Sequence, residues 1–465
     1  MSFPEVGKPR WFKQTKRVGA SGAYSGAGGV TGDGCPCSFG DAARIGVNGL
    51  MSIPFSRRHF LQTAGATAAI WVPAPVNGYS ASEVSNRAAA HGSELSELGI
   101  SLWDLDTPAL VVDLDALEGN LEVMQRVVGE NGIASRPHAK THKTPAIARM
   151  QLATGSVGIC VAKVSEAQAL FDNGIEHLLQ TTTNVTALKI ERAMNLRRWC
   201  HNFVQATDTM ENARLLSEAA EAAGVVADVV VDVAPGGHRT GITPGQPALE
   251  LGQLVDQLPG LRLRGMLCYD GGSQHVAGFA ARQTQTLERL GPASETLERF
   301  RRSGLNTEIF SGGGTGTYNI DHQNPGFTDV QVGSYVFMDA QYLGICGASN
   351  AELYTDFQPA LTILTTVLNA QYEGRATTDA GAKACTINRP WPIVKGESGM
   401  SYTSGSDEFG SIRYEDPSRT YRVGDKLELI VSHCDPVVNL YDQMYAVRGG
   451  VVEAVWEIAA RGKST

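Results

Sequence analysis

The sequence contains no apolar run long enough to cross a bilayer as a helix, so stable membrane insertion through such a helix is not expected. Its formal net charge is −9 and it lacks extensive basic clusters, which argues against nucleic acid as its main partner. No Gly-x-Gly-x-x-Gly follows the first predicted strand, which disfavours a dinucleotide-binding fold. What remains is a chain of 465 residues, 42% of them hydrophobic, which is enough for a large core and two domains.

Paired cysteine spacing is nearly absent as well. Apart from Cys35 and Cys37, the cysteines are scattered, mostly in apolar segments. The scattered residues are Cys160, Cys200, Cys268, Cys346, Cys385 and Cys434. Without a paired spacing or Cys-x-x-Cys, we expect buried free thiols rather than a disulfide framework.

The first 95 residues differ in composition from the rest. Residues 1–50 are rich in Gly and Ser, and Met51 then precedes Arg57 and Arg58, an apolar Ala-rich stretch and a run of small residues. This order resembles a twin-arginine export signal. We expect residues 51–95 to be that signal and a linker, residues 1–50 to be a non-native or disordered extension, and the protein to be periplasmic. Because Arg-Arg pairs also occur by chance, a cytoplasmic protein is the alternative.

From Thr107 onward, predicted strands alternate with helical patterns, which indicates a parallel sheet with both faces covered. The predicted strands cover residues 108–114, 133–137, 157–162, 176–180, 202–206, 226–233, 261–269, 306–310 and 330–337. The clearest helices cover residues 164–172, 186–199, 209–223 and 276–302. Nine strands are one more than a (β/α)8 barrel needs. Either the first strand belongs elsewhere, or the sheet is open and doubly wound.

After about Gly347 the helical periodicity fades and short β-rich runs take over, which predicts a second, all-β domain. These runs cover residues 361–368, 375–379, 384–387, 420–431 and 444–457. The polar, Gly- and Ser-rich span 395–413 is expected to be a long loop.

Lys140 lies in a basic stretch, RPHAKTHK at residues 136–143, directly after a predicted strand. In α/β barrels the loops at the carboxyl ends of the strands carry the chemistry. Neighbouring positive charge and partial burial both favour a neutral amine, which could attack a carbonyl group. The alternative is an ordinary basic surface loop.

Other polar or glycine-rich stretches also follow predicted barrel strands. They cover residues 236–241, 269–275 and 311–316, and 333–335 lie within the last predicted strand. Each one alone could be an ordinary tight turn. Gly-rich loops near strands seven and eight are where such barrels bind phosphate through backbone N–H groups. Together with a reactive lysine they suggest pyridoxal phosphate, with an Arg near its ring.

His433 and Asp435 end another predicted strand. If the strand geometry continues, residues two apart share a face, so both side chains point together and Cys434 points away. A His nitrogen and a carboxylate oxygen suit a divalent metal that keeps open positions for water or substrate. The alternative is a histidine with satisfied hydrogen bonds beside a capping Asp.

Five motifs together resemble those of the D-threonine aldolase and D-serine dehydratase family. They are RPHAKTHK at 136–143, SGGGTGTY at 311–318, VGSYVFMD at 332–339, TDAGAKA at 378–384 and SHCDPVVNLYD at 432–442. The resemblance implies an α/β fold with a pyridoxal-phosphate-binding (β/α)8 barrel of alanine-racemase type over residues 115–345. It also implies a β-domain that carries the metal site, formed by residues 96–114 with 346–465. The strand at 108–114 would then belong to the β-domain.

The same resemblance implies roles for individual residues. Lys140 would carry pyridoxal 5'-phosphate as a Schiff base, His275 would be the catalytic base, and His433 and Asp435 would bind a divalent metal (Mn, Mg or Zn). The other expected cofactor contacts are Arg239 and Tyr269 near the ring and Gly313, Gly314, Thr315, Gly333, Ser334 and Tyr335 at the phosphate.

Aldolases of this family carry His-x-Asp where the dehydratases carry His-x-Cys, and this chain has His-x-Asp. The resemblance therefore implies a homodimeric, metal-dependent lyase that cleaves small β-hydroxy-D-amino acids to glycine and an aldehyde. A dehydratase of the D-serine or D-3-hydroxyaspartate type, which releases a 2-oxo acid and ammonia, is one alternative. A non-catalytic pyridoxal-phosphate carrier is another. Such carriers resemble a lone barrel, so the expected β-domain counts against this second alternative.

Overall fold

The computed structural model describes residues 97–236 and 239–465. The expected export signal with Arg57 and Arg58, and the expected extension at residues 1–50, lie outside these residues. Within them, no helix is both long enough and apolar enough to cross a membrane.

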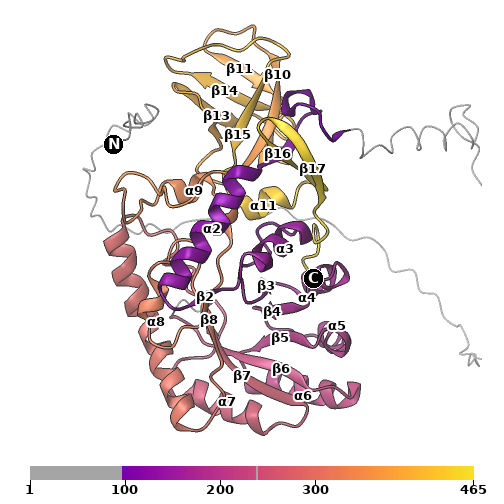
Figure 1. The fold of residues 1–465 in the computed structure, drawn as a ribbon, viewed down its shortest axis with the longest axis vertical. Coiled ribbons are helices and arrows are strands. Elements are labelled where there is room, and N and C mark those ends of the chain that lie inside the picture. The colour runs from indigo at the N-terminus through magenta and orange to yellow at the C-terminus, as the bar shows by residue number, and fades with distance from the viewer. Residues whose placement is uncertain (1–96, 237–238) are drawn as a thin grey trace, which may run out of the picture. The chain divides into compact units, whose positions relative to one another are not determined.

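The first sheet is parallel, and helices lie along its outside (Figure 1). It closes into a barrel through a parallel bridge between His138 and Cys160. Its strands are β2 (Ala134–Ser135), β3 (Ile159–Val161), β4 (His177–Gln180), β5 (Asn202–Thr207), β6 (Ala227–Asp232), β7 (Leu261–Cys268), β8 (Ile309–Gly312) and β9 (Asp329–Val330). They pair in the order β2-β9-β8-β7-β6-β5-β4-β3. Backbone hydrogen bonds join the two ends of this order, because Cys160 donates to Pro137 O (2.8 Å) and Ala139 donates to Cys160 O (2.8 Å). The structure therefore confirms the predicted barrel.

Helices connect and cover the barrel strands. They are α3 (Pro145–Ala153), α4 (Val164–Asp172), α5 (Ala187–Trp199), α6 (Met210–Ala223), α7 (Gln246–Gln257) and α8 (Phe279–Arg302). Local sequence explains their ends well. Thr209, for example, caps α6 by accepting a hydrogen bond from Asn212 N–H, and Gly224 ends this helix in the left-handed conformation (φ 65°).

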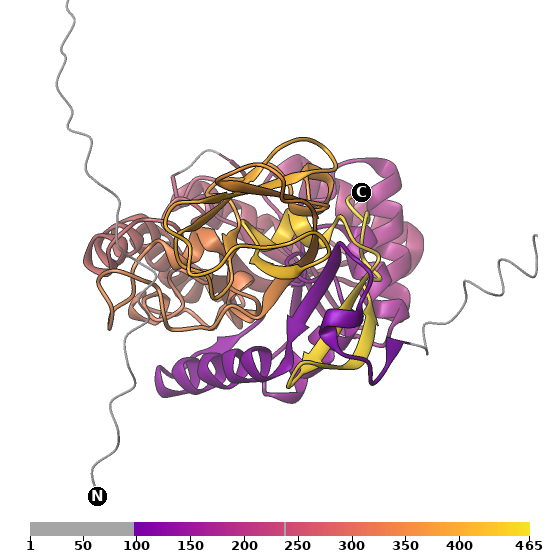
Figure 2. The same cartoon turned by 90° about the horizontal axis from the view of Figure 1, so that it is seen from above.

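The second sheet contains nine of the described strands and is mostly antiparallel. They are β1 (Ala109–Asp113), β10 (Leu361–Asn369), β11 (Arg375–Thr378), β12 (Ile393–Val394), β13 (Met400–Ser404), β14 (Gly410–Tyr414), β15 (Lys426–Ile430), β16 (Gln443–Arg448) and β17 (Val451–Glu457). Strand β1 lies between β10 and β16, antiparallel to the first and parallel to the second. In Figure 2 this indigo strand runs beside the yellow hairpin of β16 and β17.

Two predictions for this part of the chain are wrong. The span 395–413 is not a loop, because β13 and β14 pair as an antiparallel hairpin from Met400↔Tyr414 to Ser404↔Gly410. Its polar residues alternate with Tyr402 and Ile412, which are buried, so a half-buried sheet accounts for the composition. Residues 384–387 are not a strand, since α10 (Ala382–Cys385) ends within them.

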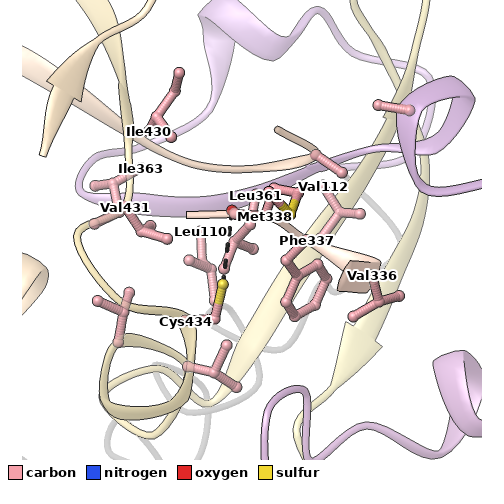
Figure 3. Packing of buried hydrophobic residues seen from close by; sticks show 14 of the residues in the cluster. Leu110, Val112, Val336, Phe337, Met338, Leu361, Ile363, Ile430, Val431 and Cys434 are labelled. Atoms are coloured by element: carbon pink, nitrogen blue, oxygen red, sulfur yellow. Dashed lines mark hydrogen bonds between the residues drawn. The ribbon is translucent and has the colours of Figure 1, made fainter. Parts of the chain in front are cut away.

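One hydrophobic cluster joins the two sheets. It packs α2 (Leu114–Glu130) and residues 335–338, which follow the barrel, against the second sheet. Figure 3 shows Leu110 and Val112 of β1 and Leu361 and Ile363 of β10 around Phe337 and Met338. The six cysteines of the described chain are all free, and five of them are buried, as predicted.

Candidate active site

Lys140 lies in the turn that follows β2, at the edge of a cavity of about 360 Å³. The cavity wall combines the carboxyl ends of the barrel strands with the segment that follows β15. Ten of the residues predicted for the site line it: Lys140, Arg239, Tyr269, His275, Gly314, Thr315, Gly333, Ser334, His433 and Asp435. Segments that are far apart in the sequence thus meet at one place.

Gly313 and Tyr335, also expected at the phosphate, do not line this cavity. Gly313 has a φ of 62°, and a Cβ atom there would lie 1.9 Å from Asp321 Oδ2. Tyr335 is fully buried, and its hydroxyl accepts a hydrogen bond from Gln151 Nε2 (3.2 Å). The prediction that residues 333–335 continue a strand is wrong. The strand β9 ends at Val330, and residues Ser334–Val336 form a 3-10 helix as the chain turns toward the second sheet.

The electrostatic surroundings of Lys140 differ from the predicted ones. Its positively charged neighbours are neutralised, because Arg136 pairs with Asp329 (3.0 Å) and the buried Lys143 pairs with Glu166. Burial disfavours the charged form of Lys140, but attraction to Asp435, whose Oδ2 lies 3.6 Å from Nζ, leaves the pKa of the amine raised. The prediction of a neutral amine is therefore wrong, because the Asp435 carboxylate favours the charged form of Lys140.

The two nearby histidines are neutral. Burial lowers the pKa of His142 to about 4 and the pKa of His138 well below its ordinary value. His138 Nδ1 accepts a hydrogen bond from Lys140 N–H (3.3 Å), and its Nε2 lies 3.1 Å from Thr181 Oγ1. In the neutral ring, Nε2 therefore carries the proton. His138 thus fixes the backbone of the turn that carries Lys140.

His433 and Asp435 both line the cavity, but not for the predicted reason. The strand does not continue, since β15 ends at Ile430 and α11 (Cys434–Val438) begins directly after His433. Cys434 does point away: it is fully buried, and its Sγ donates to Met338 O at 3.7 Å (Figure 3). The first turn of a helix, rather than strand alternation, brings the imidazole and the carboxylate to the cavity.

The buried Asp339 contacts the backbone and the imidazole of this segment. It is fully buried, and its Oδ2 lies 3.1 Å from His433 Nδ1 and accepts a hydrogen bond from Cys434 N–H (3.1 Å). Burial lowers the pKa of His433, but the hydrogen bond and charge of Asp339 outweigh this effect and raise it. The contact with Nδ1 leaves Nε2 as the free nitrogen of His433. Asp435 Oδ1 is buried and has no hydrogen-bond partner among the described residues.

His275 lies in the loop after β7, and its ring packs on Tyr342, with 4.4 Å between the ring centroids. Burial, aided by the positive charges of His433 and Arg282, lowers the pKa of His275. It is therefore neutral at neutral pH and able to accept a proton.

Eight further polar or aromatic side chains line the cavity and were not predicted as site residues: His138, Thr141, Thr181, Thr182, Asp232, Thr240, Gln331 and Tyr342. The position of several of them in the sequence could have predicted that they line the site. Thr181 and Thr182 follow β4, Asp232 ends β6 and Gln331 follows β9, all positions at the carboxyl end of a strand. Tyr342 has no such signal, because it lies on α9 (Ala340–Leu343), beyond the barrel strands.

The cavity offers several free groups that suit a phosphate. The N–H groups of Thr315, Gly333 and Ser334 have no hydrogen-bond partner within the described chain, and neither does the buried Thr141 Oγ1. A Cβ atom on Gly333 would lie 2.5 Å from Thr141 Oγ1, so only glycine keeps this corner open. Free N–H groups beside a hydroxyl are what a phosphate monoester requires.

Asp321 supports the glycine-rich turn, and it allows a prediction about pH. Burial raises the pKa of its carboxyl group to about 8. The folded protein holds this proton more tightly than the unfolded chain does. The proton therefore contributes fully to the free energy of unfolding below about pH 4, and this contribution is lost as pH rises through about 8. We expect Asp321→Asn to remove this loss, so that its melting temperature falls less than that of the wild type between about pH 6 and pH 9.

Thermal unfolding at a series of pH values measures this effect. Asp256→Asn, at an exposed carboxylate of α7, serves as the control and should follow the wild type. An equal decline in the wild type and Asp321→Asn would contradict the prediction.

The comparisons with known proteins agree with this geometry. Residues 112–341 match the family model of the alanine racemase N-terminal domain, and residues 360–447 match that of a serine dehydratase domain. The chain is 37% identical to a D-threonine aldolase from Arthrobacter sp. over 79% of this chain and 95% of that one. It is 34% identical to a 3-hydroxy-D-aspartate aldolase from Paracoccus denitrificans, over 78% and 94%.

A solved structure of a D-threonine aldolase from Filomicrobium marinum is similar along the same part of the chain. It superposes with a TM-score of 0.75 at 37% identity and covers 79% of this chain and 98% of that one. The resemblance predicted from the five motifs is thereby confirmed. The chain belongs to the alanine-racemase-like family that includes D-threonine aldolase and 3-hydroxy-D-aspartate aldolase.

Proposed function

We propose that this protein is a pyridoxal-phosphate-dependent lyase that cleaves β-hydroxy-D-amino acids to glycine and an aldehyde. The observation that carries the proposal is the content of one cavity: Lys140, free N–H groups suited to a phosphate, and His275 beside His433 and Asp435. The relatives named as aldolases support carbon–carbon bond cleavage as the reaction.

The residues present fit pyridoxal phosphate. Lys140 Nζ would bond to its aldehyde carbon, and Thr315, Gly333, Ser334 and Thr141 would hold its phosphate. When bound, the cofactor withdraws the electron pair that the broken carbon–carbon bond leaves behind. Arg239 lies 5.1 Å from the centroid of the Tyr269 ring, and these two side chains would position the pyridine ring.

We also propose that a divalent metal binds beside Lys140. Nε2 of His433 and the unpartnered Oδ1 of Asp435 are the two atoms that would bind it, and Asp339 orients the imidazole from behind. No group of three or more His, Cys, Asp or Glu side chains among the described residues could hold a metal. Two protein ligands leave positions for water and substrate, and the metal would lower the pKa of the substrate hydroxyl group.

His275 would then accept the proton of this hydroxyl group. Its lowered pKa keeps the ring ready to accept a proton, and the contact with the Tyr342 ring, tilted at 37°, limits its movement. Formation of the aldehyde C=O bond from the deprotonated oxygen breaks the Cα–Cβ bond. The glycine part retains the electron pair until it is protonated.

Dehydration on the same scaffold is the rival reaction. The identity of residue 435 favours the aldolase, because a carboxylate is a harder ligand than a thiolate and suits an ion that holds an alkoxide oxygen. The adjacent thiol of Cys434 cannot substitute, since it is buried on the other side of the helix turn.

A product assay tests the proposal. The protein, loaded with pyridoxal phosphate and Mn²⁺, would be incubated with the D and L forms of threonine, 3-phenylserine and 3-hydroxyaspartate. We expect glycine and the matching aldehyde in equal amounts from the D forms. Release of ammonia and a 2-oxo acid without glycine would refute the aldolase assignment and favour the dehydratase.

A further inference from the structure

Gln274 lies between the glycine-rich turn, which would bind the phosphate, and His275, which would act as the base. It directly precedes His275 in the loop after β7, and only 1% of it is exposed. Its side chain contacts the glycine-rich turn at 312–317. Oε1 accepts a hydrogen bond from Gly316 N–H (3.0 Å), and Nε2 donates to Thr317 Oγ1 (3.0 Å).

The glycines of the turn allow this contact. A Cβ atom on Gly314 would lie 2.6 Å from Gln274 Oε1, and one on Gly316 would lie 2.0 Å from the backbone oxygen of Gln274. The turn is therefore packed directly on both the side chain and the backbone of Gln274. A shift of this residue must move the turn, His275 or both.

The hydrogen bonds have a fixed direction. Thr317 Oγ1 donates to Asp321 Oδ2 (2.7 Å), so it must accept from Gln274 Nε2. Gln274 Nε2 also donates to Asp270 O (3.2 Å), at the start of its own loop. One planar amide thus supplies an acceptor to the turn, a donor to the turn and a donor to the loop of His275. A carboxylate cannot supply the two donors, and an apolar side chain supplies none of these groups.

We propose that Gln274 is a positioning residue that holds the phosphate turn and His275 in a single arrangement. This inference rests on the proposed function and extends it. The N–H of Thr315 belongs to the turn that Gln274 holds, while His275 is the next residue in the chain. The phosphate site and the base are therefore set by one side chain, and its loss disturbs both.

Two variants and two ligands test this inference. Gln274→Met has a similar shape but makes no hydrogen bonds, and Gln274→Glu keeps an acceptor but loses the donors. Apo-protein would be titrated with pyridoxal phosphate and, separately, with pyridoxal, which lacks the phosphate. We expect both variants to bind pyridoxal phosphate roughly tenfold more weakly, in line with the loss of buried hydrogen bonds. Pyridoxal affinity should change by less than about twofold.

Steady-state kinetics give a second measurement. At saturating cofactor, kcat should fall by roughly tenfold in both variants while KM stays within about twofold, because His275 acts in the chemical step. The control is Gln285→Glu. Gln285 Nε2 donates to Gly272 O (3.1 Å) and Ser273 Oγ (3.2 Å) in the same loop but makes no hydrogen bond to the turn among the described contacts. This control should match the wild type in all three measurements.

The outcomes separate this inference from the proposed function. If the variants bind pyridoxal phosphate and pyridoxal more weakly by the same factor, Gln274 has a general structural role and the inference is overturned. Variants with wild-type affinity and wild-type kcat would also overturn it. Melting temperatures of both variants would show whether they fold, and the isosteric Gln274→Met, which buries no charge, remains decisive if Gln274→Glu does not fold. Wild-type protein that binds neither ligand would overturn the inference together with the proposed function.

Discussion

Lys140→Ala is expected to abolish both activity and the visible absorption band of the lysine-bound cofactor. Among the described residues no other lysine lines the cavity, and the amine of Lys140 would form the covalent bond to the cofactor. Turnover should therefore fall by roughly three orders of magnitude or more. Absorbance spectra before and after borohydride reduction, followed by mass spectrometry of the labelled peptide, measure cofactor attachment directly.

Lys143 supplies the matched control, because it lies three residues away in the same motif. Its Nζ is buried against Glu166 and the backbone oxygen of Ala460, so it is not free to bond to a cofactor. Lys143→Met should keep the absorption band and lose stability instead, because Glu166 is left as an unpaired buried carboxylate. A band that persists in Lys140→Ala and disappears in Lys143→Met would show that the assignment of the lysine is wrong.

Asp435→Ala is expected to remove turnover while the cofactor stays bound. None of the proposed phosphate contacts involves Asp435, and loss of its attraction to Lys140 Nζ (3.6 Å) favours the neutral amine that would bond to the cofactor. The proposed metal, in contrast, loses one of its two protein ligands. The variant should therefore behave like wild-type enzyme treated with a chelator, with kcat reduced by roughly a hundredfold or more and the absorption band intact. Activity with a series of added Mn²⁺, Mg²⁺ and Zn²⁺ concentrations measures the effect.

Cys434→Ser is the control for this site. The thiol is buried and bonded to Met338 O, away from the cavity, so a hydroxyl of similar size should leave kcat and metal dependence nearly unchanged. Full activity in Asp435→Ala, or wild-type activity that survives complete chelation, would remove the metal from the reaction.

The sequence predicted well those features that depend on neighbouring residues. The pattern at 164–172 matches α4 at both ends, and nearly all the chemically important loops follow strands as expected. Predictions from the sequence were wrong where the charge or the structure of a segment depends on residues far away in the chain. The charge near Lys140 was misjudged because the carboxylate that pairs with Arg136 lies 193 residues away in the sequence. Likewise, the polar span 395–413 was predicted as a loop, but its strand β14 pairs with β11 as well as with β13, and β11 lies outside that span.

The strand order of the second sheet has a consequence for biosynthesis. Strand β1 begins at Ala109, yet its two neighbours in the sheet are β10 and β16, which are synthesised much later. On the ribosome, the strands of the barrel emerge in order and can pair as they appear, whereas β1 must wait for nearly the whole chain. His433 and Asp435 also emerge only near the end. The nascent chain therefore completes its glycine-rich loops before the part of the cavity wall that carries His433 and Asp435 is in place.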